Sequence, residues 1–219
     1  MAGFMVYSIP GSPYGRAVLI ALEEKGADYR LSPVAPGAFG SPEHMARHPM
    51  AKVPVLQHGD FMVYETQAIL RYLDRVLPDP SFTPADPRAA ARMDQAMNVN
   101  DCYLFNGVSN TIGFQRVVGP RVLGLTPDEA IIAAALPRGR QVFGVLAGIL
   151  GEGPYFAGES LSLADFLLAP QIDFFRDLPE WADLGGPHPH LGAWLDRMNV
   201  RPSLAKTTWD MVAEMAKTA

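Results

Sequence analysis

The stretch from Lys52 to Leu77 constrains the fold of this chain more than any other part. It predicts a short strand, a Gly-Asp turn, a second short strand and an amphipathic helix. Pro54 stands just inside the first strand, where a proline removes a ladder donor and is normally excluded. Glu65 and Thr66 stand where the second strand passes into the helix, whose first N–H groups attract an anion. The stretch therefore favours a site for a short, peptide-like anionic ligand.

The residues before this stretch predict the rest of a small α/β domain. Residues 4–9 are typical of a strand, and Ser12-Pro13 of a helix N-cap followed by proline at the first helical position. The helix is expected to end at Gly26, and residues 28–34 predict a second strand. Residues 1–78 are therefore expected to form a βαβ-ββα domain.

Residues 78–87, PDPSFTPADP, contain four prolines and no apolar periodicity, so we interpret residues 79–87 as a linker. Beyond it the pattern predicts an all-α domain over residues 88–219. Five helices are expected, over residues 87–118, 127–150, 162–177, 188–199 and 202–217. Pro137 is expected to kink or split the second helix. Ser162 and Asp165 predict a capping box at the start of the third, with a structural role.

Composition excludes several classes of function. The net charge is −5, and no cluster of Lys and Arg is present, which argues against nucleic acid or an anionic membrane as partner. No run of about 18 apolar residues predicts a membrane span. Cys102 is the only cysteine, which favours an intracellular location, and it is expected to be a small buried hydrophobe. The histidines lack ligand spacing, so no metal site is predicted.

Taken together, the Ser12-Pro13 helix start, Lys52-Val53-Pro54, Glu65-Thr66 and the helical second half resemble a cytosolic glutathione transferase. The opening MVYSIPGSPYGRAVLIALEEKG is similar to the serine-type classes, particularly the phi class, in a bacterial-type member. The resemblance implies a thioredoxin-like first domain that binds glutathione. It also implies a helical second domain that forms the electrophile pocket.

The resemblance assigns glutathione-binding roles to particular residues. The Val53-Pro54 bond is expected to be cis, and the Val53 backbone to pair with the cysteinyl part of glutathione. Glu65 and Thr66 match the acid-serine pair that holds the γ-glutamyl end, with Thr in place of Ser. Phe39-Gly40 replace the basic pair that similar proteins often carry. The glycyl carboxylate is therefore left to Lys52, His44 or Arg47.

Ser12 matches the position of the catalytic serine, whose hydroxyl would donate to the thiol sulfur. Lowering a thiol pKa of about 8.5 by about 2 units requires about 2.7 kcal/mol. A hydrogen bond to the charged sulfur supplies about 1.5–3 kcal/mol, and the helix N-terminus about 0.3–1 kcal/mol. Tyr7, near the end of the first strand, is the alternative donor, and Ser12 would then be only an N-cap.

For the electrophile site, the resemblance implies candidate residues but no motif. Tyr14 and, on the first helix after the linker, Phe105, Asn106, Asn110 and Arg116 are candidates for its lining. The alternative for the latter four is a helix face packed against its neighbours, on which Asn106 and Asn110 lie one turn apart. Asp101 is expected either to reach the glutathione of a partner subunit or to be a solvated carboxylate.

The function that follows from the resemblance is conjugation of the glutathione thiolate to small hydrophobic electrophiles, in detoxification. Glutathione would be a co-substrate, no metal would be needed, and the enzyme would be a cytoplasmic homodimer. Two alternatives stay open. One is a non-catalytic or regulatory binding protein of this fold. The other is a glutathione-dependent peroxidase, reductase or isomerase that uses the same site.

Overall fold

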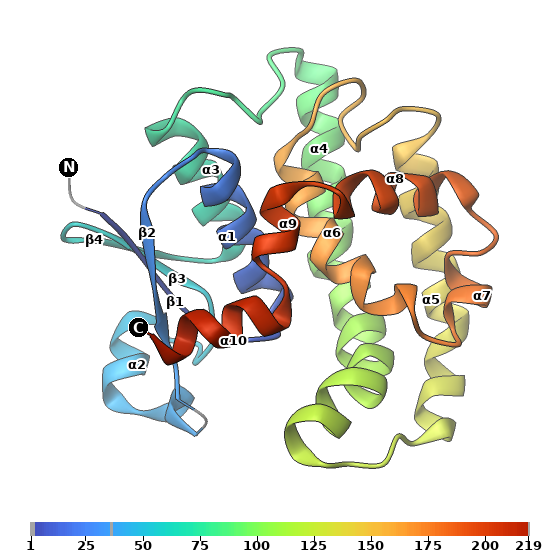
Figure 1. Ribbon diagram of the computed structural model, residues 1–219. Coiled ribbons are helices and arrows are strands. Elements are labelled where there is room, and N and C mark those ends of the chain that lie inside the picture. Colours follow the sequence, from blue (N-terminus) through green and yellow to red (C-terminus); the bar gives the residue numbers. More distant parts are fainter. Residues whose placement is uncertain (1–2, 36, 219) are drawn as a thin grey trace. The chain divides into compact units, whose positions relative to one another are not determined.

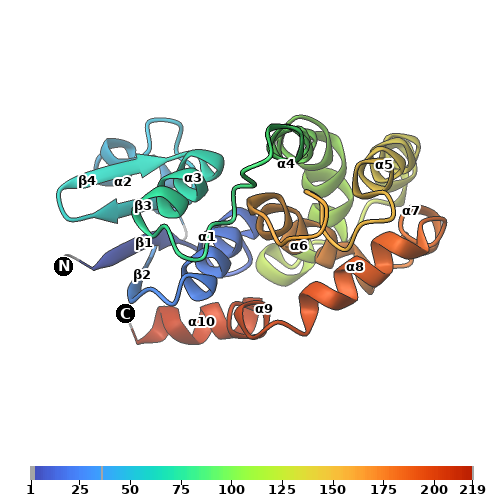
Figure 2. The ribbon, with the colours of Figure 1, turned by 90° about the horizontal axis from the view of Figure 1, so that it is seen from above.

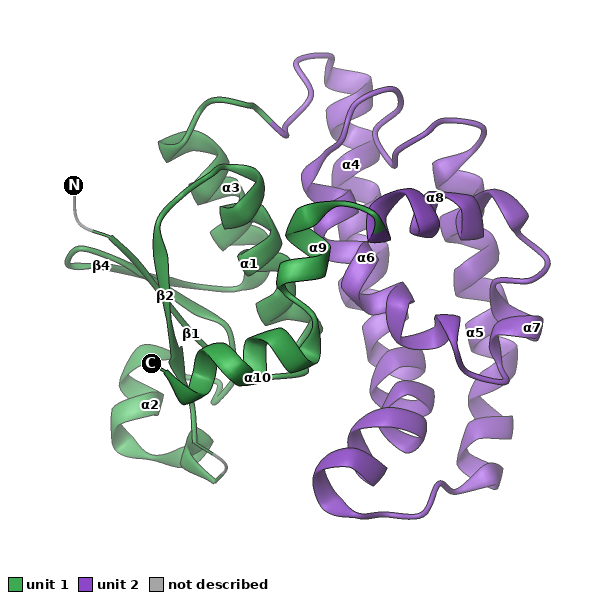
Figure 3. Cartoon of the chain, in the orientation of Figure 1, with its two compact units in different colours: residues 1–81, 200–219 green, residues 82–199 purple. Residues whose placement is uncertain are grey.

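The computed structural model describes residues 3–35 and 37–218. Its contacts divide the chain into two compact units, residues 1–81 with 200–219 (unit 1) and residues 82–199 (unit 2; Figure 3). The break at residue 81 falls inside the predicted linker. Unit 1 combines a sheet with helices, and unit 2 is built from helices (Figure 1).

Unit 1 contains a four-stranded mixed sheet in the order β2-β1-β3-β4. Its strands are β1 (Phe4–Ser8), β2 (Tyr29–Pro33), β3 (Val55–His58) and β4 (Phe61–Tyr64). β1 pairs in parallel with β2 and antiparallel with β3, and β4 closes a hairpin on β3. The expected βαβ-ββα order is confirmed, including the turn between β3 and β4, where Gly59 has a φ of 64°.

Two layers of helix cover the sheet, and the period-two alternation along β1 shows which residues face each layer. Phe4, Val6 and Ser8 are buried on the face of α1 (Pro13–Glu24) and α3 (Thr66–Val76). Tyr7 points to the opposite face, where Arg47 of α2 (Pro42–Arg47) lies 4.3 Å from the centroid of its ring. A short 3₁₀ helix, η1 (Ala38–Gly40), precedes α2.

The core of unit 1 lies between the sheet and the pair α1–α3. Ile69, Leu70 and Leu73 of α3 are fully buried, and each such burial is worth about 1.5–3 kcal/mol. Lys25, which caps α1, reaches Asp74 of α3 at 2.7 Å, and both side chains are almost completely buried. The two helices are thus joined by an ion pair as well as by apolar contact.

Residues 200–218 do not extend the helical unit. The sequence predicted one helix over 202–217 within the all-α half. The structure instead has α9 (Pro202–Lys206) and α10 (Trp209–Lys217), separated at Thr207-Thr208 and grouped with unit 1. α9 lies along α1, and α10 lies along β2 (Figures 1 and 2). Arg201 forms a bidentate ion pair with Glu24 of α1, at 2.8 and 2.7 Å, which explains this placement.

Unit 2 contains six helical segments. They are α4 (Pro87–Val99), η2 (Asn100–Leu123), α5 (Glu129–Leu150), α6 (Leu163–Arg176), α7 (Trp181–Leu184) and α8 (Pro189–Asn199). The prediction of one helix over residues 87–118 is wrong. α4 continues into the π-type segment η2, and non-helical backbone at Asn106 and Gly107 breaks η2. Pro137 does not split α5, which runs through it.

Asp165 carries the predicted capping box of α6. Its side chain is fully buried and accepts hydrogen bonds from the N–H groups of Phe156 and Ser162, at 3.1 and 2.8 Å, and from the indole of Trp194, at 2.8 Å. The predicted structural role is therefore confirmed. Asp165 also joins α6 to α8, through its hydrogen bond from Trp194.

By length and composition, one helix of the described part of the chain, α5, could cross a membrane. Its most apolar window has a mean hydropathy of 1.2. Val142, Phe143 and Leu146 on this helix are buried within unit 2. α5 packs against η2 and α7, as expected of a core helix in a globular unit.

Candidate active site

The predicted glutathione-binding segments of unit 1 leave the sheet at the same end. Tyr7 of β1 is paired with Val55 of β3, and Val55 is paired with Tyr64 of β4. The loop to Ser12 follows β1, Pro54 immediately precedes β3, and Glu65 immediately follows β4. The strand register therefore brings together three stretches that lie far apart in the sequence.

Ser12 lies at the start of α1, as predicted. Its Oγ accepts a hydrogen bond from the N–H of Gly15 at 3.0 Å, and within the described residues it makes no other. A Cβ on Gly15 would collide with Ser8 Oγ, so the first turn of α1 can approach β1 only with glycine there. Because an accepting hydroxyl keeps its proton, the Ser12 O–H group can still donate to a ligand.

The Val53-Pro54 peptide bond is cis, as the resemblance predicted. Lys52 precedes it, is exposed, and forms no ion pair within the described residues. Its carbonyl oxygen accepts a hydrogen bond from Nε2 of His44 at 2.9 Å. His44 is 2% exposed, so its imidazole holds the backbone ahead of Val53 and is not available to a glycyl carboxylate.

Glu65 and Thr66 form the start of α3. Glu65 has a φ of 69° and a ψ of 113°, a conformation that a residue with a side chain rarely adopts. Its carboxylate is exposed and does not cap the helix. The Thr66 hydroxyl also has no hydrogen-bond partner within the described part of the chain. An exposed carboxylate and a buried hydroxyl without a partner in the described residues thus stand next to each other at the N-terminus of α3.

His48 lies close to this cluster, and sequence reasoning gave it no role. Its ring stacks on Tyr64 with centroids 4.6 Å apart, and its Nδ1 accepts from the N–H of Met50 at 3.3 Å. Burial lowers the pKa of His48 below 6.5, the charge of Glu65 opposes this shift, and His44 and Lys52 reinforce it. A neutral His48 is consistent with its accepting role. Nothing in a single sequence distinguishes it from a surface histidine.

Tyr7 and Arg47 are engaged with other residues of the unit. The Tyr7 hydroxyl donates to Oε1 of Gln57 at 2.7 Å, so its proton is already used. Arg47 pairs with Glu43 at 2.6 Å and lies over the Tyr7 ring. Of the three candidates for the glycyl carboxylate, only Lys52 has its charged group unpaired within the described residues. Tyr14 lies half-buried in the first turn of α1.

The remaining candidates lie in η2 of unit 2, and the geometry expected for two of them is wrong. Asn106 is not helical, so Asn106 and Asn110 do not lie one turn apart on a continuous helix. Asn106 donates to the carbonyl of Asp101 at 2.7 Å, and Asn110 accepts from the N–H of Gly107 at 2.8 Å. Both amides therefore satisfy backbone groups at the break. Phe105 directly precedes it.

Arg116 is bound to two carboxylates. Its guanidinium reaches Glu129, at the start of α5, and Glu180, each with a shortest distance of 2.6 Å. Hydrogen bonds from Arg116 are the main reason that the pKa of Glu129 is low. These contacts favour a packing role for Arg116. Cys102 is exposed, so the expectation of a buried cysteine is wrong.

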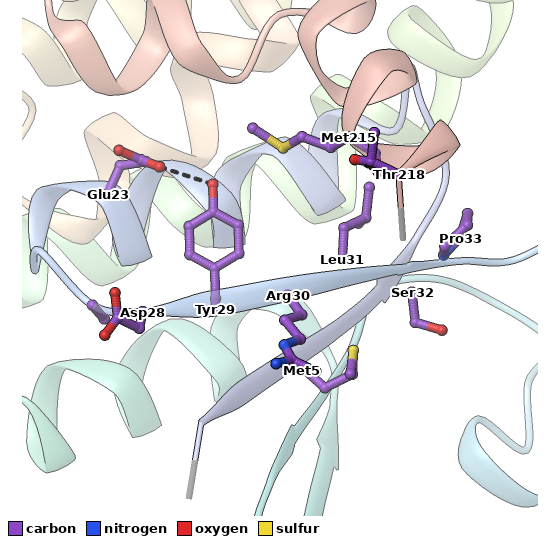
Figure 4. A pocket seen from close by; sticks show the side chains of 11 residues that line it. Met5, Glu23, Asp28, Tyr29, Arg30, Leu31, Ser32, Pro33, Met215 and Thr218 are labelled. Atoms are coloured by element: carbon purple, nitrogen blue, oxygen red, sulfur yellow. Dashed lines mark hydrogen bonds between the residues drawn. The ribbon is translucent and has the colours of Figure 1, made fainter. Parts of the chain in front are cut away.

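A pocket of about 740 Å³ lies at the opposite edge of the sheet, along β2 (Figure 4). Tyr29, hydrogen-bonded to Glu23, lies on one side of the strand together with Met215 of α10, and Arg30 and Met5 lie on the other. The predicted site residues do not line this pocket. Within residues 3–35 and 37–218, no cluster of three His, Cys, Asp or Glu side chains could hold a metal.

Comparison with known proteins identifies two family models. The model of the glutathione S-transferase N-terminal domain matches residues 2–75, and that of the C-terminal domain matches residues 108–202. Glutathione S-transferase 1 of Zea mays is 32% identical over 188 residues, covering 85% of this chain and 86% of its own.

Two solved structures show the same fold. Glutathione transferase F7 from Populus trichocarpa has a TM-score of 0.83 at 26% identity, covering 97% of this chain and 99% of its own. Glutathione S-transferase I from mais, in complex with an atrazine glutathione conjugate, has a TM-score of 0.82 at 30% identity and covers both chains completely.

Proposed function

Since this chain belongs to the glutathione S-transferase family, we propose that it joins the glutathione thiolate to small hydrophobic electrophiles. In this proposal the Ser12 hydroxyl donates a hydrogen bond to the thiolate sulfur. The single observation that supports this role is the geometry of Ser12. Its hydroxyl is anchored by the Gly15 N–H and keeps its own proton for a ligand, at the N-terminus of α1. Tyr7, the alternative donor, has its proton bound to Gln57.

The reaction that we propose has three parts. The glutathione thiol loses its proton to solvent, and the Ser12 O–H group and the α1 N-terminus stabilise the resulting sulfur anion. The sulfur electron pair then attacks an electrophilic carbon and forms a C–S bond. With an aryl halide, the C–halogen bond breaks and the halide leaves with its electrons.

Glutathione itself would be held by the three segments at the end of the sheet. The Val53 backbone beside the cis peptide bond would pair with the cysteinyl part, and Glu65 and Thr66 would bind the γ-glutamyl end. Lys52 would bind the glycyl carboxylate. The unpaired state of all three polar side chains within the described residues supports this assignment.

We also propose a cytoplasmic homodimer. In unit 1, Phe61 and Met62 of β4 are 47% and 43% exposed, and in unit 2, Tyr103 and Val145 are 47% and 44% exposed. A hollow of about 260 Å³ in unit 2 is lined in part by Tyr103 and Val145. Contiguous exposed apolar patches are typical of surfaces that a partner covers, and we propose that these side chains belong to such a surface. The unpaired Cys102 fits a reducing compartment.

Calorimetric titration with glutathione, combined with an assay on an activated aryl halide, tests this function. We expect binding and turnover by the natural protein, and loss of most turnover with retained binding in Ser12→Ala. Tyr7→Phe should keep most of its turnover. Binding without turnover in the natural protein would instead indicate a non-catalytic binding protein. Absence of binding would refute the proposal altogether.

A further inference from the structure

The loop that carries Ser12 is covered by the C-terminal helix α10. A Cβ atom on Gly11 would lie 2.5 Å from Cη2 and Cζ3 of Trp209, so the indole ring rests directly on the Gly11 backbone. Gly11 also has a φ of 79°, which side chains other than glycine rarely allow. The contact and the backbone conformation both favour glycine at this position.

This contact falls on the turn that ends at Ser12. The Ser12 N–H donates to the carbonyl of Ile9 at 3.3 Å, and Pro10 and Gly11 occupy the two corners between them. Proline followed by a glycine of positive φ is the pattern of a type II turn. Trp209 therefore packs on the last corner before Ser12.

The segment that carries Trp209 is fixed to α1, the helix that Ser12 caps. Arg201 is paired with Glu24, Lys206 reaches Glu23 at 2.8 Å, and Arg16 donates to the carbonyl of Leu204 at 3.3 Å. Burial raises the pKa of Glu24, but hydrogen bonds from Arg201 and Ser203 outweigh it, so this pKa is lower than usual.

Hydrogen bonds of Thr207 and Thr208 also fix the start of α10. Thr207 is fully buried, and its hydroxyl donates to the carbonyl of Ser203 at 2.8 Å. Thr208 caps α10 by accepting from the N–H of Met211 at 3.3 Å. Trp209 is the first residue of the helix, so its ring is held where α9 and this cap place it.

We propose that Trp209 is a positioning residue for Ser12, and that the C-terminal segment thereby tunes the ionisation of bound glutathione. This inference rests on the proposed function. Loss of the indole ring leaves the Pro10-Gly11 turn uncovered and lets the Ser12 hydroxyl leave its place. A displacement of about 1 Å at a reacting group costs up to about 100-fold in rate.

The test compares Trp209→Ala and Trp209→Phe with Trp181→Ala. Trp181 is a matched control, because it is also half-buried and packs on a glycine, Gly185, but it belongs to unit 2. For each protein, kcat, KM for glutathione and the pH at which bound glutathione ionises are measured. Ionisation is followed by the ultraviolet absorbance of the thiolate, and thermal melting checks folding.

We expect Trp209→Ala to lower kcat by about 10- to 100-fold and to raise the ionisation pH, with KM for glutathione changed less than about twofold. Trp209→Phe should recover part of both losses, and Trp181→Ala should behave as the natural protein. A selective loss in kcat and a raised ionisation pH in Trp209→Phe supports the inference even if Trp209→Ala does not fold.

Two results would overturn the inference and leave the proposed function intact. They are an unchanged ionisation pH in the folded Trp209 variants, and an equal shift in Trp181→Ala. If the natural protein does not bind glutathione, the proposed function fails and this inference fails with it.

Discussion

At Glu65 the backbone is held in a conformation that costs stability. The Glu65 side chain is exposed and does not cap the helix. Such strain typically costs about 1–3 kcal/mol and is found at binding sites. Ala51 also has a positive φ, of 54°, but carries no functional group. The pair allows strain and function to be separated at single residues.

We expect Glu65→Gly to raise the free energy of unfolding by about 1 kcal/mol, because glycine relieves the strain, and to weaken glutathione binding at least tenfold. Ala51→Gly should gain similar stability without that loss. Denaturant titration and calorimetry measure the two effects. Unchanged glutathione affinity in Glu65→Gly would remove Glu65 from the binding site.

His48 gives a prediction about acid stability. Its pKa is lowered in the folded protein, chiefly by burial, so the unfolded chain binds its proton more readily. Stability is therefore complete above pH 6.5 and falls as the pH decreases from 6.5 toward the folded-state pKa. Replacement by Asn should flatten this part of the profile. A pH profile with the same slope in both proteins would show that His48 does not contribute.

At the scale of elements, short sequence patterns were sufficient to predict where most helices and strands begin and end. They were not sufficient to predict which elements pack against each other. The strands, the β3–β4 turn and the α6 cap follow from short patterns around Pro54, Gly59 and Ser162, and the structure confirms them. The break in η2 was missed because its helical pattern continues through Asn106 and Gly107. A helical period shows which face is apolar and does not show which element that face meets.

Asp165→Ala tests how much a single cap contributes to its element. The change leaves the buried donors of Phe156, Ser162 and Trp194 without an acceptor, at about 1–3 kcal/mol each. We expect the free energy of unfolding to fall by at least about 3 kcal/mol. Asp177→Ala, at the exposed end of the same helix, should change it by less than about 0.5 kcal/mol. Equal effects would mean that the buried network is unimportant.

At the scale of the whole molecule, the sequence predicted an α/β part, a helical part and the family. It did not predict that residues 200–218 pack with the first part. The α1–α9 contact depends on Glu24 and Arg201, which are 177 positions apart, and a pattern search over short windows does not link them. Candidate residues in unit 1 each belong to a short motif, and the strand register brings these motifs to one end of the sheet. Those in η2 belong to no such motif. In the structure Arg116 forms an ion pair with Glu180, and Asn110 accepts a hydrogen bond from the Gly107 N–H.

The proposed dimer is tested by one charge on β4. Phe61→Asp should convert the protein from a mass of twice 23.8 kDa to 23.8 kDa in sedimentation, because a buried carboxylate would oppose association. Val200→Asp, at an apolar position that is 82% exposed, is the control and should stay dimeric. A natural protein that sediments as a monomer would contradict the dimer directly.

The ionisation of bound glutathione, followed by thiolate absorbance against pH in the natural protein and in Ser12→Ala, tests the central claim most directly. We expect half-ionisation in the natural protein about 2 units below the usual thiol pKa of about 8.5, and a clear return toward that value in Ser12→Ala. Identical ionisation curves for the two proteins, with glutathione bound to both, would contradict the account.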